Sequence, residues 1–477
     1  MNVTLTTHDL MKLGPYLVML AGPVLLIILI ALKRNHLVTW LAAMAIFLVT
    51  FILSVAGMKS NALVPLFVID KFSMFYSALF SAAGFLITFM SYSYFGRSDE
   101  QTEEFYVLLI FATLGSSLLV ASRHFVSLFL SLEVLSISLY AMIGYFKKTN
   151  FGIEAGIKYL VLAAMSSAVL LFGLALIYLE TGTMDYTQLG ASLMISGMSP
   201  WMLGGMALVV AGAGFKLSVA PFHWWTPDVY QGASSPVTSF VATVSKGGMV
   251  GALIRLFTAV HGFQYESMVL VVSVIAILSM FTGNILALLQ NNIKRLLAYS
   301  SIAHLGYILI AFLAGMNHGT EAATFYLVAY FATTLGAFGV ITFLTSGEGE
   351  PEELSYYKGL FYRNPWVAAF LSLVMFSLAG IPLTAGFVGK FYIASAGVGV
   401  GLWTLLIILA VNSVIGVFYY LRVVAMMFTG QEEGIKETNP SLISMGGLAL
   451  LFLAFVILWV GIMPAWILEV IRSVANL

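Results

Sequence analysis

The sequence predicts an all-α integral membrane protein of about fourteen transmembrane helices. Of its 477 residues, 61% are hydrophobic and 9% are charged, whereas soluble domains are about 45–50% apolar and about 25% charged. Apolar runs of about 20 residues, the length that crosses a bilayer, follow one another with short polar breaks. These runs are continuous rather than alternating, which favours helices over the strands of a membrane barrel.

The apolar runs place the helices in order along the chain. We expect them near 15–32, 37–57, 72–94, 104–121, 124–146, 156–180, 201–222, 233–260, 267–289, 293–315, 321–345, 362–396, 401–428 and 443–470. No linker between them is long enough to separate soluble domains, so we expect a single membrane domain. The longest polar stretch, 346–364, is predicted to be a solvated loop, and it holds Glu348, Glu350, Glu352 and Glu353.

Two of these helices, the seventh and the twelfth, are interrupted by proline. Residues 214–232 read GFKLSVAPFHWWTPDVYQG, and residues 378–392 read LAGIPLTAGFVGKFY. Proline removes a backbone donor and clashes with the preceding turn, so inside a membrane such a break needs protein or a water-filled cavity to satisfy the freed groups. Both breaks lie beside a lysine. Matched interruptions of this kind point to a transporter built from inverted repeats, with its ion path at the breaks.

The composition excludes several classes of function. The chain has no cysteine, which excludes disulfides, thiolate-ligated iron–sulfur clusters and cysteine-attached haem. Its formal net charge is zero, which argues against a nucleic-acid partner. The seven histidines show no metal-ligand spacing, and no glycine-rich loop resembles a nucleotide site. If the protein takes part in redox chemistry, we expect its partners to carry the cofactors.

Basic residues in the short loops predict the orientation. Six lie on the side that holds the N-terminus, namely Lys12, Lys59, Lys71, Arg123, Arg255 and Arg472. Eleven lie on the other side, namely Lys33, Arg34, Arg97, Lys147, Lys148, Lys294, Arg295, Lys358, Arg363, Arg422 and Lys436. Because cytoplasmic loops carry the excess of Lys and Arg, we expect both termini to face outward, which agrees with an even number of helices.

A few ionisable residues remain inside the apolar runs. They are Glu133, Lys216, Lys246 and Lys390, with Lys158 near a helix start. A charge at the centre of a membrane helix costs about 2.5–3.5 kcal/mol on insertion scales, so such residues usually mark an ion or proton pathway. Lysine suits proton transfer because burial and a nearby carboxylate shift its proton affinity in opposite directions, whereas arginine keeps its proton. His223 and His304 are further candidates for a proton relay.

Each candidate also has a structural interpretation. Lys158, Lys216 and Lys390 could lie near helix ends and extend their amines to the interface. Glu133 and Lys246 could belong to a purely structural buried pair. The two histidines could be hydrogen-bonded groups of the core.

The motifs around these residues resemble those of the antiporter-like membrane subunits of respiratory complex I, the proton-pumping NADH:quinone oxidoreductase. The segments that carry the resemblance are LFLSLEVLSISLYAMIGY around Glu133, GFKLSVAPFHWWTPDVYQGASSPV around Lys216, ATVSKGG around Lys246, NNIKRLLAYSSIAHLGY from Asn291, and LAGIPLTAGFVGKFY around Lys390. In this family, M-type subunits usually have glutamate where Lys390 stands, and L-type subunits have a different sequence around the second break. Both features favour the third type of antiporter-like subunit in this family, which is neither M-type nor L-type.

The resemblance implies a fold of fourteen helices in which helices 4–8 and 9–13 form inverted repeats with broken helices 7 and 12. The parts would be N-terminal helices over 1–103, a first repeat over 104–260, a second repeat over 267–428 and a C-terminal helix over 429–477. It also implies that Glu133 pairs with Lys216 and that Lys246 links toward Lys390. Lys158, His223 and His304 would line the proton path.

The function that the resemblance implies is that of a translocase subunit. Protons would move from the cytoplasm to the outer side, driven by electron transfer from NADH to quinone in other subunits. The chain would be a multi-pass protein of the bacterial inner membrane and would bind no cofactor or metal itself. Its partners would be the other membrane-arm and peripheral subunits, with FMN, the iron–sulfur clusters and quinone bound there.

Two other functions fit the same residues. The chain could be a subunit of a multi-subunit cation/proton antiporter, driven by ion gradients rather than by electron transfer. It could also be a structural scaffold that buries its charges as fixed ion pairs. A self-contained solute carrier fits less well, because no polar constellation suits an organic substrate.

Overall fold

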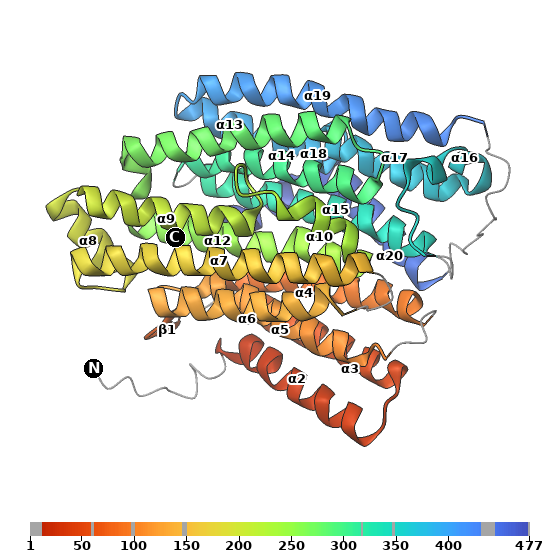
Figure 1. Ribbon diagram of the computed structural model, residues 1–477, viewed down its shortest axis with the longest axis horizontal. Helices are drawn as coiled ribbons and strands as arrows, with labels where there is room; N and C mark the ends of the chain where they lie inside the picture. The colour runs from red at the N-terminus through yellow and green to blue at the C-terminus, as the bar shows by residue number, and fades with distance from the viewer. Residues whose placement is uncertain are drawn as a thin grey trace.

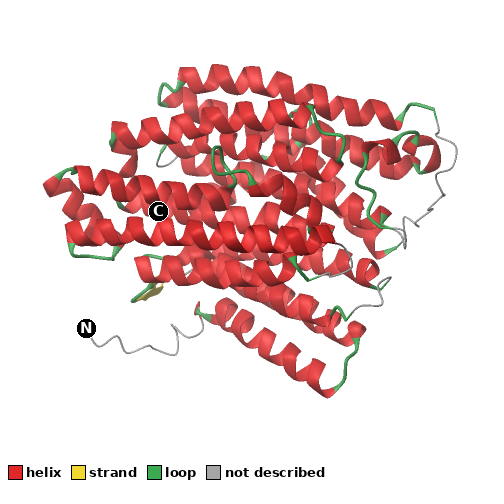
Figure 2. Cartoon of the chain, viewed as in Figure 1, coloured by secondary structure: helices red, strands yellow, loops and turns green. Residues whose placement is uncertain are grey.

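The computed structural model describes residues 12–58, 62–96, 101–145, 150–315, 318–345, 349–430 and 444–475. Its helices lie with their long axes roughly side by side, from α2 (Gly14–Leu32) at one edge to α19 (Trp403–Met427) at the opposite edge (Figure 1). Within the described residues the only sheet is a short antiparallel hairpin of β1 (Ala62–Val64) and β2 (Phe67–Ile69) (Figure 2).

Thirteen of the described helices are long and apolar enough to cross a membrane. They are α2, α3 (His36–Gly57), α4 (Lys71–Phe95), α5 (Glu103–Ala121), α6 (Phe125–Ile143), α7 (Asn150–Thr181), α9 (Pro200–Leu217), the continuous segment of α11 (Ser235–Phe240), the π-helix η1 (Val241–Ser245) and α12 (Lys246–Ala259), then α13 (Glu266–Leu288), α14 (Ile293–Leu313), α15 (His318–Leu344), α19 and α20 (Met445–Ile462). The shorter α17 (Pro365–Ala379) and α18 (Ala385–Gly399) occupy the region predicted as one interrupted helix. The all-helical membrane fold is therefore confirmed.

Polar side chains fix where several of these helices begin. Asp70 forms a capping box with Ser73 and accepts from its backbone N–H at 2.9 Å at the start of α4. Asn35 and Asn292 cap α3 and α14 in the same way. These side chains satisfy amides that the first helical turn leaves unpaired, and such pairing is obligatory for backbone that enters hydrocarbon.

Both proline breaks are present. α9 ends at Leu217 and α10 (Trp225–Gly232) follows, while α17 ends at Ala379 and α18 begins five residues after Gly380. At each break the first residue after the helix has a positive φ, 64° at Ser218 and 83° at Gly380. A left-handed residue at this position ends a helix and turns the chain. Each crossing therefore has two half-helices with freed backbone groups between them.

Three elements differ from the sequence-based expectation. The hairpin and the short α8 (Tyr186–Ser196) were not expected. The helix predicted over 443–470 is wrong as one element, because α20 ends at Ile462 and a separate α21 (Ala465–Ala475) follows Pro464. Proline cannot continue α20, since it lacks the amide and clashes with the preceding turn. The division into two inverted repeats stays a prediction.

The fold separates interior crossings from crossings that face the bilayer. The most apolar part of Ser235–Ala259 is entirely buried, as is 94% of that part of α14 and of α15, against 28% for α7 and 33% for α19. The interior crossings carry Lys246 and His304. These two residues are therefore enclosed by protein rather than by lipid.

Candidate functional site

The predicted glutamate and the first predicted lysine lie on facing helices, in a group of polar side chains that we call the Glu133 cluster: Glu133, Ser136, Tyr159, Ser167 and Lys216. Ser167 donates to Glu133 Oε1 at 2.6 Å from α7. Lys216, 3% exposed at the end of α9, donates to Ser136 Oγ at 3.1 Å and to Tyr159 OH at 3.0 Å. The sequence thus brings together side chains from α6, α7 and α9.

The expected pair of Glu133 and Lys216 lies in this one cluster, where the two charges interact without direct contact. Both residues are described, and no ion pair within 4.0 Å joins them. Glu133 turns toward Ser167, and Lys216 contacts Ser136, which lies one helical turn after Glu133 on α6. The carboxylate and the ammonium therefore each bind hydroxyl groups, which can both accept and donate a proton.

Lys246 is fully buried and has a different set of partners. It is 0% exposed and donates to Ser301 Oγ at 2.6 Å. Its amine lies 5.4 Å from the centre of the Tyr230 ring, a cation–π contact that partly replaces water around the charge. Ser301 Oγ also hydrogen-bonds Tyr330 OH at 2.7 Å. Among the described residues no carboxylate lies within ion-pair distance of Lys246.

One face of α14 extends from Lys246 toward Lys390. Ser301, His304 and Tyr307 follow one another at intervals of three residues, so they lie on adjacent turns of one side of the helix. His304 Nδ1 hydrogen-bonds Tyr326 OH at 2.6 Å, and its Nε2 hydrogen-bonds a second tyrosine hydroxyl, that of Tyr420, at 3.1 Å. We call Lys246, Ser301, His304, Tyr307, Lys390 and the three tyrosines Tyr326, Tyr330 and Tyr420 the α14 cluster.

Lys390 lies at the second helix break. Its amine donates to the Ala379 carbonyl at 2.8 Å, where α17 ends, and lies 5.2 Å from the centre of the Tyr307 ring. A cation at a helix C-terminus satisfies an orphan carbonyl and is favoured by the helix dipole. Gly380 leaves room for it, because a Cβ there would be 2.9 Å from the Lys390 side chain. The sequence pattern around the break therefore seats a buried amine.

Lys158 and His223 do not join either cluster. Lys158 is 44% exposed in its side chain and forms ion pairs with Glu154 at 2.6 Å and Asp228 at 3.0 Å. Asp228 also binds Arg295 at 2.8 Å. His223 is buried within the first break and stacks on Trp224 with ring centres 5.1 Å apart. Lys158 therefore matches the interpretation of a lysine that reaches an aqueous edge.

The acidic loop after α15 is not simply solvated, contrary to the sequence-based expectation. Glu350 is partly buried, with a side chain 10% exposed, and pairs with Lys294 at 2.7 Å, while Lys294 is only 1% exposed in its side chain. Glu350 also accepts from Tyr94 OH, Ser235 N and Ser235 Oγ at 2.7, 2.7 and 2.8 Å. Burial acts to raise the pKa of Glu350, but the Lys294 charge and these hydrogen bonds outweigh it and hold that pKa below its ordinary value of 4.5.

Several loop charges used for orientation or loop prediction lie outside the described residues, namely Lys59, Arg97, Lys147, Lys148, Lys436 and Glu348. Lys294 and Arg255 were counted as loop charges, and both are buried. Arg255 binds both carboxylate oxygens of Asp70 at 2.8 and 2.9 Å. These two cations are anchors between helices rather than solvated loop residues.

A buried amide beside the α14 cluster was missed at the sequence level. Asn284 Nδ2 donates to Tyr307 OH at 2.9 Å and to Asn412 Oδ1 at 3.2 Å, and its Oδ1 accepts from Tyr419 OH at 3.0 Å. Asn284 and Asn412 are both 0% exposed. A polar amide within an apolar run is itself a signal, because polar side chains in a membrane face protein partners.

The contrast between these cations is the main electrostatic feature of the site. Among the described residues, Arg123, Lys158, Arg255, Lys294 and Arg295 all form ion pairs with carboxylates. Lys216, Lys246 and Lys390 form none, and their amines bind only hydroxyl or carbonyl oxygens. An amine without a fixed counter-charge can lose its proton without leaving a carboxylate unpaired. The three central lysines are therefore suited to gain and release protons.

The chain resembles known membrane proteins along nearly its whole length. Residues 122–416 match the family described as NADH:quinone oxidoreductase/Mrp antiporter, TM. The chain is 42% identical to NADH-quinone oxidoreductase subunit N of Methylococcus capsulatus, over 98% of this chain and 96% of that protein. It superposes with a TM-score of 0.83 and 29% identity on a chain of respiratory complex I from Thermus thermophilus, covering 96% of this chain and 99% of that one.

A third match concerns the fold alone. The chain superposes on a chain of the Mrp complex from Dietzia sp. with a TM-score of 0.86 and 20% identity, covering 97% of both chains. The helical architecture is thus common to proteins of quite different sequence.

Proposed function

The chain belongs to the subunit N family of the NADH-quinone oxidoreductases, and from this membership we propose that Glu133, Lys216, Lys246 and Lys390 carry protons across the membrane arm of that complex. Protons move from the cytoplasm to the outer side, and electron transfer from NADH to quinone in other subunits drives them. The observation that carries this proposal is that the three central lysines are buried without ion pairs among the described residues.

The order of the groups follows from their contacts. Lys216 exchanges a proton with Ser136 or Tyr159, within the Glu133 cluster. Lys246 exchanges with Ser301, whose hydroxyl also contacts Tyr330. His304 continues the path through its two tyrosine partners, and Lys390 ends it at the second break. Lysine is required at these positions because arginine keeps its proton under all physiological conditions.

The supporting residues have narrower roles. Lys158 and Asp228, with Arg295, form a charged entrance at the edge of the first repeat. His223 lies at the first break, between Lys216 and Asp228 in the sequence. The chain binds no cofactor, and FMN, the iron–sulfur clusters and quinone belong to partner subunits of the complex. Both termini face the periplasm, as the excess of basic loop residues on the other side supports.

The lysine assignment is tested in the assembled complex. Lys216→Ala and Lys246→Ala complexes, reconstituted in vesicles, are compared with wild type for protons moved per NADH oxidised. We expect a lower ratio in both variants. Lys33→Ala is the matched control, because Lys33 is an exposed lysine at the end of α2. An unchanged ratio in an assembled Lys246→Ala complex would refute the role and favour a scaffold.

The partner assignment has a separate test. The native chain is purified in mild detergent, and mass spectrometry identifies the proteins that accompany it. Flavin- and cluster-bearing chains are expected. A set made only of small membrane subunits, with sodium-dependent transport that needs no NADH, would move the function to a cation/proton antiporter.

A further inference from the structure

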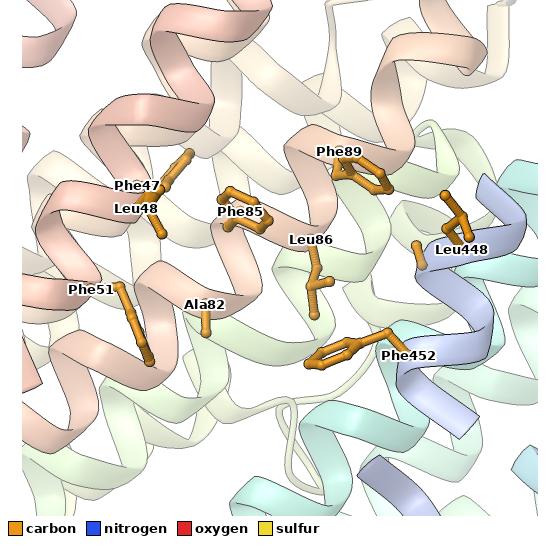
Figure 3. Close-up of a pocket in the computed structure, with 10 residues that line it drawn as sticks. Phe47, Leu48, Phe51, Ala82, Phe85, Leu86, Phe89, Leu448 and Phe452 are labelled. Carbon is orange, nitrogen blue, oxygen red and sulfur yellow. The ribbon is translucent and has the colours of Figure 1, made fainter. Parts of the chain in front are cut away.

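An apolar groove of about 390 Å³ lies between α3, α4 and α20, outside both polar clusters. All ten of its lining residues are apolar, and five are phenylalanines, namely Phe47, Phe51, Phe85, Phe89 and Phe452. Figure 3 shows these rings and Ala82 around the hollow, with contributions from three helices. No residue assigned to proton transfer lines it.

The groove lies near the middle of membrane-spanning helices and is open at the surface of this chain. Phe47 and Phe51 lie near the middle of α3, and Ala82 lies near the middle of α4. The side chains at its rim are exposed, with Phe51 at 37% and Phe452 at 52%. The groove is therefore accessible from outside the chain, at the level of its membrane-spanning helices.

The chemistry of the groove limits what can fill it. Water does not occupy an apolar hollow that offers no hydrogen-bond partner. An irregular peptide would leave its backbone polar groups unsatisfied in hydrocarbon. A hydrocarbon chain meets none of these limits, because it is narrow and has no polar group.

We propose that the groove binds one acyl chain of a membrane phospholipid. Phe89 lies at one end of the groove. At this end α3 begins, α4 ends and α20 begins. These three ends lie on the side with more basic loop residues, so the lipid belongs to the cytoplasmic leaflet. That leaflet assignment rests on the proposed orientation, whereas the acyl-chain site itself does not.

The rigid floor of the groove distinguishes this site from ordinary lipid contact. Phe47 is 0% exposed and packs on Gly84, where an added Cβ would be 2.5 Å from the Phe47 ring. Ala449, on the α20 side, is also buried. These side chains cannot move inward to close the hollow. A chain in the groove contacts three helices at once, and because apolar groups gain little from leaving lipid, this close packing provides the preference.

The test uses the whole complex in vesicles of phosphatidylethanolamine and phosphatidylglycerol that contain a small fraction of phospholipid with a diazirine in its acyl chain. After illumination and proteolysis, mass spectrometry locates the adducts. We expect several-fold more adducts on the groove residues of α4 and α20 than on the outer face of α19, which is an exposed comparison surface. Ala82→Trp fills the groove and should remove this excess. Ala410→Trp, at an exposed position of α19, should leave it unchanged.

Three outcomes would overturn the proposal. The first is equal labelling of the groove and of α19, and the second is an excess that persists in Ala82→Trp. The third is preferential labelling by a diazirine isoprenoid quinone, or cross-linking of these residues to a neighbouring subunit. If Ala82→Trp does not assemble, Phe452→Ala removes part of the rim instead, and the excess should then fall. Proton translocation is not needed for any of these readouts, so a failure here is separate from a failure of the proposed function.

Discussion

Replacing Lys294 by methionine should destabilise the chain and lower the heat resistance of the assembled complex. Lys294 Nζ binds Glu350 Oε2 at 2.7 Å and the backbone carbonyls of Gln231 and Ala233 at 2.9 and 2.6 Å. These contacts connect α14, the turn before α11 and the loop after α15. Methionine has a similar length but no charge, so the substitution isolates the loss of the ammonium group.

The expected cost follows from what remains around Glu350. Removing one partner of a buried ion pair costs about 3–5 kcal/mol, because the other charge stays buried without compensation. Glu350 keeps three donors, from Tyr94 and Ser235, so we expect the lower end, about 3 kcal/mol. Neutralising Glu350 as well should recover part of this loss, since an amide needs no counter-charge. The double variant Lys294→Met with Glu350→Gln should be more stable than Lys294→Met but less stable than wild type, because the carbonyls of Gln231 and Ala233 still lose their donor, at about 1–3 kcal/mol for a buried unpaired group.

Assembly and heat resistance report this difference. Membranes of wild type, both single variants and the double variant are solubilised, heated in steps and separated by native electrophoresis, with the amount of this chain in the complex as the readout. The Lys294→Met complex should dissociate at the lowest temperature, and the double variant at a temperature between those of Lys294→Met and wild type. Equal temperatures for Lys294→Met and wild type, or a double variant worse than either single one, would show that the pair does not hold these segments together.

The same pair predicts a dependence on pH. A carboxyl whose pKa is lower in the folded chain stabilises the fold above its unfolded value, and this contribution is lost as the pH falls through the folded value. Because the pKa of Glu350 is held below 4.5, the contribution is complete at neutral pH and disappears only in acid. The double variant should lack this component of acid sensitivity.

The remaining predictions concern the two polar clusters. Glu133→Gln should lower the ratio of protons to electrons more than Glu133→Asp, because a proton path depends on charge more than on length; equal ratios would make the carboxylate structural. Asn284→Leu should remove one hydrogen-bond partner from each of the hydroxyls of Tyr307 and Tyr419, at about 0.5–1.5 kcal/mol for each lost bond, and should reduce pumping and heat resistance together. Asn412→Leu removes one of these contacts, so its effect on both measurements should be smaller, and an effect as large as that of Asn284→Leu would contradict the assignment of Asn284 as the central group.

The sequence by itself determined the class of fold and most helix positions. The reason is that hydrocarbon forces each crossing to satisfy its own backbone, so about 20 consecutive apolar residues leave few alternatives to a helix. Proline marked both breaks for an equally local reason, since it lacks an amide wherever it stands. The same logic identified Lys216, Lys246 and Lys390, because a charge inside an apolar run is conspicuous without any knowledge of its neighbours.

Only the tertiary structure decided which groups meet. Ser301, Tyr326 and Tyr420 are unremarkable in the sequence, yet the Ser301 hydroxyl binds Lys246 and the two tyrosine hydroxyls bind His304, in each case with a partner from another helix. Lys294 and Glu350 looked like loop charges, because a pairing between residues 56 positions apart leaves no periodic trace. The π-helical turn directly before Lys246 is likewise set by packing. Local chemistry fixes where a crossing begins, breaks and carries charge, whereas the partners of each charge depend on contacts that the bilayer does not dictate.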